Sequence, residues 1–350
     1  MSTVHLPDDL RDALTRQLHA TAPGQASAQV ERLIQSYRGA APTAAPSAPI
    51  LRDAADVAAY AAYRMPATYA AVRSALGALR EQAADWAPRT HLDLGGGTGA
   101  ATWAVADAWP DGGHTSSVLD WSQAALALGS ELARDAAQQA VRDAEWTRAP
   151  LAGAPRLPAR DLVTVSYVIG ELAPADRASL IDAAAGAALG AVVVAEPGTP
   201  EGYARIIEAR QRLIAAGLTV LAPCPHDGTC PVTGDDWCHF AARVPRTSLH
   251  RQVKGGTLPY EDEKFSYVAA VRPAAVPGAP AGNRIVRHPQ IRKGQVLLDL
   301  CTRDDALTRT TVAKRHGAAY RLARDARWGE TWPPDPAAGA DAGQDGYSQP

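Results

Sequence analysis

The stretch RTHLDLGGGTGAATWAVADAW, residues 89–109, joins a short apolar segment to a run of glycines and then to an alanine-rich helical segment. Glycine residues tolerate positive φ and let backbone amides approach a ligand closely. The N-terminus of the following helix adds partial positive charge at the same place. The order of strand, glycine turn and helix therefore predicts the first unit of a nucleotide-binding α/β sheet.

The acidic residue before the glycines bears on the class of cofactor. Gly95, Gly97 and Ala100 satisfy the G-x-G-x-x-[GA] spacing of dinucleotide-binding folds. Asp93 and Gly99 extend the pattern to D-x-G-x-G-x-G, which resembles the first motif of class I S-adenosylmethionine-dependent methyltransferases. We therefore predict that Asp93, Gly95, Gly97 and Gly99 bind S-adenosylmethionine. The alternative is a glycine turn that serves only the packing of helix on strand.

Strand and helix patterns alternate after this turn. Further strands are predicted over 115–120, 161–172, 190–198 and 218–223, with helices between them, and a last strand over 264–271 is expected at the edge of the sheet. Strands that alternate with helices of this length predict a parallel, doubly wound α/β sheet. We interpret it as the Rossmann-like fold of class I methyltransferases.

The ends of the second and third strands supply further site residues. Asp120 ends the second strand, where an acidic side chain can accept hydrogen bonds from both ribose hydroxyls of a nucleoside cofactor. Ser166 lies in the third strand segment, where the sequence SYVIGEL begins, and is included in the predicted cofactor site. That sequence lacks the Asn/Asp-Pro-Pro-Tyr loop of many base N-methyltransferases and the Pro-Cys nucleophile of pyrimidine C5 methylation. No catalytic residue identifies itself, although positioning alone can suffice for a reactive sulfonium.

The rest of the chain divides into regions of different composition. We expect an N-terminal helical region over 1–85 with a Pro/Ala linker at 39–49, a methyltransferase-like domain over 86–273 with a cysteine-rich insertion at 223–260, a small basic β-rich C-terminal module over 274–333, and a disordered tail over 334–350. Pro66 is expected to end or kink a helix of the first region. A second linker rich in Pro, Ala and Gly precedes the C-terminal module and is expected to be flexible.

Membrane insertion and export are not expected. The sequence holds no run of eighteen apolar residues, and its first residues carry acids in place of an apolar signal region. We therefore expect a cytoplasmic protein without a membrane partner.

Charge is distributed unevenly along the chain. Residues 1–238 carry 18 basic and 26 acidic side chains, a net charge of −8, whereas residues 239–330 carry 17 basic and 8 acidic ones, a net charge of +9. A basic segment on a nearly neutral chain favours an anionic partner over a merely solvated face. The cations expected to neutralise phosphates are Arg243, Arg246, Arg251, Lys254, Arg284, Arg287, Arg292, Lys293, Lys314 and Arg315.

The cysteines are concentrated in one loop. Cys224, Cys230 and Cys238 lie within fifteen positions in a polar segment rich in turns, and Cys301, the last of the four, lies far downstream. A redox pair would favour C-x-x-C spacing, and a polar loop does not favour apolar burial of cysteine. The spacing favours a metal site and leaves two alternatives, an iron–sulfur cluster or a zinc site completed by histidines 226 and 239.

Several motifs together resemble one family. They are YRMPATYAAV, LDLGGGTGAATWA, SYVIGEL, AEPGTPEGY, APCPHDGTCP, EDEKFSYV, RKGQVLLDLC and WGETWP, and they lie within residues 5–333. With these motifs the chain resembles the methyltransferase-like family of small ribosomal subunit assembly factors, known in mitochondria and bacteria. The resemblance implies that Cys224, Cys230, Cys238 and Cys301 ligate a [4Fe–4S] cluster. Such a cluster would hold the C-terminal module against the methyltransferase-like domain.

The resemblance also implies a partner, the maturing small ribosomal subunit with its 16S rRNA, and no DNA. Two functions are compatible with the residues: an rRNA methyltransferase that uses S-adenosylmethionine, and a non-catalytic assembly factor that keeps the fold as a scaffold. The intact glycine loop and Asp120 favour the first, and the missing substrate loop favours the second. A nicotinamide oxidoreductase would need a hydride-acceptor site that nothing in the sequence marks. Four cysteine thiolates would leave no iron of the cluster free to bind a substrate, so we expect the cluster to have a structural role.

Overall fold

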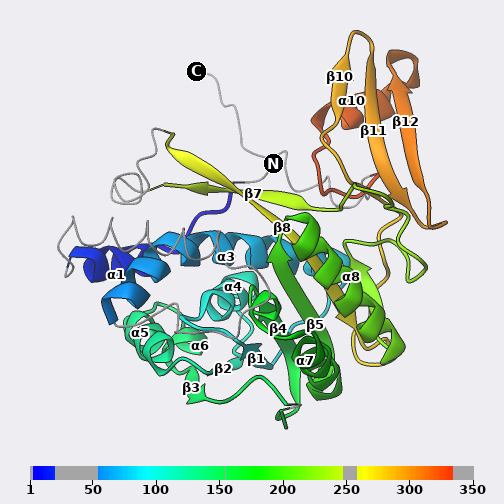
Figure 1. Cartoon of the computed structure of the whole chain (residues 1–350). Helices are drawn as coiled ribbons and strands as arrows, with labels where there is room; N and C mark the ends of the chain where they lie inside the picture. The colour runs from blue at the N-terminus through cyan, green and yellow to red at the C-terminus, as the bar shows by residue number, and fades with distance from the viewer. Residues whose placement is uncertain (1–2, 20–53, 154, 247–257, 334–350) are drawn as a thin grey trace, which may run out of the picture.

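The computed structural model describes residues 3–19, 54–153, 155–246 and 258–333 (Figure 1). The central sheet has the strand order β3-β2-β1-β4-β5-β8-β6, and β7 also pairs with β8. Its strands are β1 Thr90–Leu94, β2 Thr115–Asp120, β3 Glu145–Arg148, β4 Arg160–Ser166, β5 Ala188–Pro197, β6 Thr219–Ala222, β7 Phe240–Pro245 and β8 Tyr260–Val271. Some of the predictions concern residues outside this described part of the chain. They are the predictions for part of the N-terminal region, for the two cations Arg251 and Lys254, and for the C-terminal tail.

The direction of the strands identifies the fold. β1 to β5 pair in parallel, and β8 runs antiparallel to β5, β6 and β7. Six strands of one direction, β1 to β6, with the reversed strand β8 inserted before the last of them form the mixed sheet of class I methyltransferases, so the predicted doubly wound fold is confirmed. The predicted edge position of 264–271 was wrong, because β8 lies between β5 and β6. Its residues from Phe265 to Val271 are all buried, as expected for a strand covered on both faces.

Helices cover both faces of this sheet. One hydrophobic core joins the sheet to α3, α4 and α5, and a second joins its other face to α7 and α8 (Figure 1). The helices are α1 Asp8–His19, α3 Ala54–Gln82, α4 Ala100–Ala108, α5 Gln123–Ala133, α6 Gln139–Arg142, α7 Pro174–Ala187, α8 Pro200–Ala215 and α10 Ala318–Asp325, with short 3₁₀ turns η1 Ile169–Glu171 and η2 Lys314–His316. No helix within the described residues combines the length and apolar character needed to cross a membrane.

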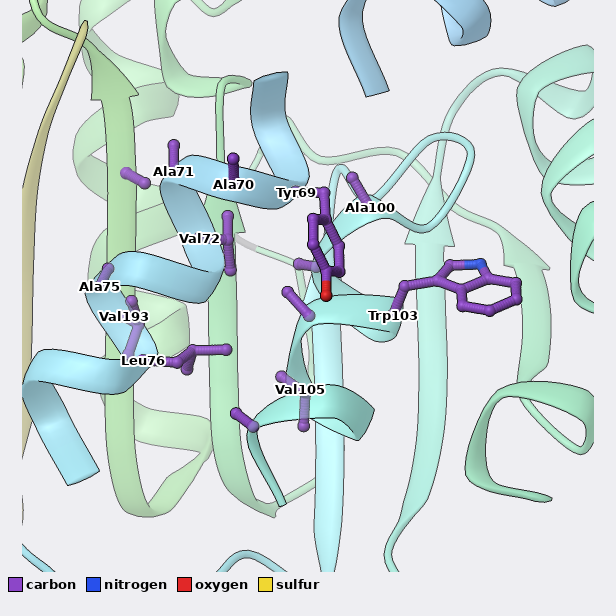
Figure 2. Close-up of a cluster of buried hydrophobic side chains, with 14 of the residues drawn as sticks. Tyr69, Ala70, Ala71, Val72, Ala75, Leu76, Ala100, Trp103, Val105 and Val193 are labelled. Atoms are coloured by element: carbon purple, nitrogen blue, oxygen red, sulfur yellow. The ribbon is translucent and has the colours of Figure 1, made fainter. Parts of the chain in front are cut away.

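Helix α3 runs without interruption through Pro66, where the sequence predicted an end or a kink. Residues on either side of Pro66 are almost fully buried, among them Met65 and Tyr69. The packing of this face against α4 stabilises the helix enough to offset the hydrogen bond that proline removes. Figure 2 shows the contact, in which Tyr69 lies beside α4, and the Tyr69 hydroxyl donates to Asp107 Oδ2 at 2.9 Å.

A second, antiparallel sheet follows in the chain. Its strands are β9 Asn283–Ile285, β10 Gln290–Arg292, β11 Gln295–Thr302 and β12 Leu307–Ala313, with β9 and β10 pairing to β11 and β11 pairing to β12. Helix α10 packs on this sheet around a small core of its own (Figure 1). We call β9 to β12, η2 and α10 the C-terminal module.

The segment before this module was expected to be a flexible linker, and it is packed instead. Val276 is 1% exposed and Ala281 is 3% exposed. Arg272 donates to the carbonyl oxygens of Ala185 and Ala188, and the Ala279 amide donates to a carbonyl at the end of α3. Buried apolar side chains in a Pro/Ala/Gly segment reflect tertiary packing that its composition does not reveal.

Candidate cofactor site and metal centre

The glycine loop connects β1 to α4 in a conformation that glycine favours. Gly95, Gly97 and Gly99 have φ values of 68°, 53° and 84°. A Cβ added at Gly97 would meet a single atom within 4 Å, Asp120 Oδ2 at 3.8 Å, so that side of the loop is open. The loop is therefore a cradle that can bring backbone close to a ligand, which fits a nucleoside cofactor.

Asp93 supports this loop from below. Its side chain is fully buried, Oδ1 accepts a hydrogen bond from the Thr164 hydroxyl at 2.9 Å, and Oδ2 has no partner. The pKa of Asp93 is raised to about 7, mainly by burial and in part by the nearby Asp120 carboxylate, while the Thr164 hydrogen bond opposes the shift. Asp93 thus shapes the loop through Gly96, whose Cα lies against its carboxyl group.

We expect Asp93→Asn to flatten the pH dependence of stability. The folded pKa of about 7 lies above the ordinary 3.8, so the folded state binds this proton more tightly than the unfolded chain. The stabilisation is complete below the unfolded pKa and is lost as the pH rises from about 4 to about 7. Urea unfolding of wild type and variant across that range measures the effect, with the exposed Asp111→Asn as control. Parallel curves for wild type and Asp93→Asn would contradict it.

Asp120 lies at the end of β2, beside the loop. Oδ2 accepts from the Gly97 amide at 2.9 Å, and Oδ1 accepts from the Ser122 amide at 2.7 Å. Burial raises the pKa of Asp120, and the hydrogen bonds from the backbone amides oppose this shift. The side chain is 6% exposed. A carboxylate has about four acceptor positions, so two remain for hydroxyl donors.

The chain after β4 borders the loop through Val168. Ser166 is 8% exposed, and the next residue, Tyr167, has a φ of 57° and donates its hydroxyl to Glu263 Oε1 at 2.9 Å. Val168 packs directly against the Cα of Gly95. The Tyr167 hydroxyl is therefore engaged in the structure and is not a free general base.

Gly95 and Gly97 form a matched pair for mutagenesis. A Cβ at Gly95 would overlap the Val168 side chain, whereas a Cβ at Gly97 would not. We expect Gly95→Ala to cost about 2–5 kcal/mol, from overpacking and left-handed strain, and Gly97→Ala only about 1–2 kcal/mol from strain. Urea denaturation of both variants measures the difference. Equal losses would show that Val168 yields without cost.

The four cysteines line one cavity although they come from two distant segments. Cys224, Cys230 and Cys238 lie between β6 and β7, and Cys301 lies on β11. The cavity has about 500 Å³ of atom-free space, part of it open to solvent. All four are free thiols. Hence four soft donors surround one space, which is the donor set of an iron–sulfur or zinc centre.

Burial is the main cause of the altered thiol chemistry at this cavity. It raises the pKa of Cys224, raises the pKa of Cys238 well above its ordinary value, and raises the pKa of Cys301 to about 12. Neighbouring cysteines add to each shift. A bound metal would reverse this balance, since coordination removes the thiol proton.

The two histidines named for the zinc alternative differ in their surroundings. His226 Nε2 lies 3.5 Å from Cys301 Sγ, and its Nδ1 lies 2.8 Å from Asp305 Oδ1. His239 is stacked on Trp237 and meets Trp328 edge-on. Within the parts of the chain that the structure describes, no three His, Cys, Asp or Glu side chains are arranged to hold one metal ion. The four cysteine thiols that line the cavity are the donors that an iron–sulfur cluster would use.

The predicted phosphate-binding cations separate into three groups. Arg292, Lys293, Lys314 and Arg315 are exposed, and the Lys314 amide donates to the carbonyl of Gly294, so they share one end of the C-terminal module. Arg243, Arg246 and Arg287 are paired with Asp262, Glu261 and Asp236. Arg284 is 1% exposed, so its prediction as a phosphate ligand was wrong. We call the first group the basic tip.

The sequence did not predict the contribution of one tryptophan and two arginines to these sites. Trp146 of β3 packs against the Cα atoms of Gly99 and Gly129, although its strand gave no pattern in the sequence. Arg210 and Arg284, which resemble surface cations in the sequence, line the cysteine cavity. Only their burial reveals them.

The family description "Mitochondrial small ribosomal subunit Rsm22" matches residues 54–333. Human "Ribosome assembly protein METTL17, mitochondrial" is 28% identical over 289 residues, which cover 78% of this chain and 62% of the human protein. The Schizosaccharomyces pombe "Rsm22-cox11 tandem protein 2, mitochondrial" is 28% identical over 187 residues, covering 41% of this chain and 24% of the yeast protein. The chain thus spans less than two thirds of either relative.

Among solved structures, magnesium protoporphyrin IX methyltransferase from Synechocystis PCC 6803 with bound SAH is similar at a TM-score of 0.39 and 14% identity. The match covers 59% of this chain and 83% of that one. An O-methyltransferase family protein from Burkholderia thailandensis is similar at a TM-score of 0.40 and 17% identity, covering 63% of this chain and 60% of that one.

Proposed function

This chain belongs to the Rsm22 family, and from that premise we propose that it is an rRNA-binding assembly protein of the small ribosomal subunit. In this proposal a [4Fe–4S] cluster joins the C-terminal module to the methyltransferase-like domain. The observation that carries it is the presence of Cys301 in the same cavity as Cys224, Cys230 and Cys238. Metal ligands from two segments couple their positions, because metal binding supplies folding free energy.

The basic tip is the surface proposed to contact rRNA. Arg292, Lys293, Lys314 and Arg315 are exposed at one end of the antiparallel sheet, so a phosphate backbone can reach them. Contacts of this kind position a protein on RNA without reading its sequence. Their energetic signature is salt dependence, because each neutralised phosphate releases counterions.

S-adenosylmethionine is the cofactor proposed for the glycine loop. Asp120 would accept the ribose hydroxyls, and the loop from Gly95 to Gly99 would lie against the methionine part of the ligand. When bound, the cofactor supplies an electrophilic methyl group. Methyl transfer to rRNA is the second candidate function, favoured by the open side of the loop at Gly97, and the first candidate does not require it.

The test uses anaerobically purified protein that holds iron and sulfide. We expect it to co-sediment with immature small subunits, and changing all four residues of the basic tip to alanine should reduce the slope of log affinity against log salt by about 3. The matched control removes Arg243 and Arg309, which are already paired with carboxylates. Loaded protein that fails to bind either immature subunits or their rRNA would overturn the proposal.

A further inference from the structure

Two arginines are buried in the wall of the cysteine cavity. Arg210, from α8, is 3% exposed, and Arg284, from β9, is 1% exposed. Arginine stays protonated in proteins, so each brings a permanent positive charge into the interior. The rest of the lining consists of apolar side chains, the four thiols, Ser266 and two tyrosines.

Neither arginine forms an ion pair with a described carboxylate, although the charge of Arg284 acts at longer range to lower the pKa of Glu81. The guanidinium of Arg210 donates to the carbonyl of His226, and that of Arg284 donates to the carbonyls of Pro223 and Gly329. No described carboxylate oxygen lies within 4.0 Å of either group. By contrast, Arg205, which precedes Arg210 on α8, pairs with the buried Glu196 at 2.7 Å.

Each guanidinium also keeps an unused donor. Arg210 Nε and Arg284 Nη2 are buried without any hydrogen-bond partner. A buried charge without an ion-pair partner is costly, and an unsatisfied donor of a charged group adds to that cost. Two such groups in the wall of one cavity indicate that the cavity holds an anion.

The anion that fits is the cluster itself. A [4Fe–4S] cluster bound by four thiolates is negatively charged, because its ligands outweigh the positive charge of its core. Protein charges and hydrogen bonds around such a cluster set its reduction potential.

We propose that Arg210 and Arg284 are positioning residues that supply the counter-charge for the cluster and thereby set its retention and its reduction potential. The inference rests on the proposed function, which places the cluster in this cavity. Reduction adds negative charge, so nearby cations favour the reduced cluster. Loss of one guanidinium should therefore favour the oxidised form.

The experiment compares substitutions that keep or remove the charge. We would prepare wild type, Arg210→Lys, Arg210→Met, Arg284→Lys and Arg284→Met anaerobically, and measure iron, acid-labile sulfide and the midpoint potential. At a given applied potential, each Met variant should have a ratio of oxidised to reduced cluster about tenfold higher than wild type. For a one-electron couple this corresponds to a midpoint potential lower by about 59 mV. The Lys variants should stay near wild type. Arg309→Met, which removes an exposed arginine paired with Asp299, is the control and should not shift.

The outcomes separate this inference from the proposed function. Met variants that fold but lose iron, while Lys variants keep it, would also support the inference. Lys and Met variants that behave alike, whether both match wild type or both lose iron, would overturn it, since hydrogen bonding or packing would then explain the residues. A wild-type protein that holds no cluster would overturn the proposed metal centre and this inference with it.

Discussion

Replacing Cys301 with serine is expected to empty the cluster site and to loosen the C-terminal module while the central sheet stays folded. Cys301 is the proposed ligand on β11, and it lies in register with Arg284 of β9 and Leu307 of β12. Serine preserves the size of the side chain but removes the thiolate, and three cysteines then remain for a cluster that needs four ligands.

Besides the buried hydrogen bond from Arg284 to the Pro223 carbonyl, two ion pairs join the module to the domain. Arg287 pairs with Asp236 and Asp305 pairs with His226, and in both pairs the carboxylate side chain is exposed. Exposed ion pairs contribute about 0–1 kcal/mol each, whereas metal binding can contribute about ten. Loss of the cluster should thus open the contact between the module and the domain without reaching the core of the central sheet.

Hydrogen exchange measures this opening. Amides of β11 should exchange at least tenfold faster in Cys301→Ser, while those of β4 and β5 should keep their protection. Leu307→Ser, at the exposed position opposite Cys301, is the matched control and should retain iron. If iron is lost and β11 keeps wild-type protection, the cluster does not hold the module.

The elements that the sequence predicted well have strong local patterns. The segment around Asp93 shows strand, glycine turn and helix within twenty residues, and β1, α4 and β2 begin where those patterns begin. Proline at the start of α7 and α8 marks both helices, because it fits the first turn and lacks the amide that this turn leaves unpaired.

The elements that the sequence did not predict depend on tertiary contacts. β3 is a short, mostly exposed edge strand without an apolar alternation. The run FSYVAAV shows that β8 is buried on both faces, yet it does not specify which strands lie beside it. Pro66 stays inside α3 because of the burial of its neighbours, which local propensity does not include.

For the candidate sites too, the sequence predicted what local residue types and spacing determine, and it did not predict what depends on tertiary packing. The sequence identified the four cysteines and the acidic residues next to the glycine loop, because their residue types and spacing carry chemistry. It did not distinguish Arg284 from Arg292, although one is buried at the cavity and the other is exposed at the basic tip. That distinction arises from the packing of the C-terminal module against the loop after β6, over more than 60 positions of sequence.

Asp120→Ala is expected to weaken S-adenosylmethionine binding at least a hundredfold. The Asp120 carboxylate has two acceptor positions beyond those used by the amides of Gly97 and Ser122. Hydrogen bonds to a charged acceptor contribute about 1.5–3 kcal/mol each, so the loss of two costs about 3 kcal/mol or more. Titration calorimetry of the loaded protein with S-adenosylmethionine and with its demethylated product measures the change.

Folding and binding must be separated in this variant, because Asp120 also orders the loop. Thermal unfolding without ligand reports the structural loss, and Asp120→Asn, which keeps the shape and one acceptor, should bind more tightly than Asp120→Ala. Asp111→Ala, in an exposed turn after α4, controls for the loss of one acid and should bind like wild type. If Asp120→Ala binds like wild type, the ribose lies elsewhere. If the wild-type protein with its cluster binds neither ligand, the glycine loop serves the packing of α4 on β1, and the methyltransferase fold acts in this chain as a scaffold for the C-terminal module.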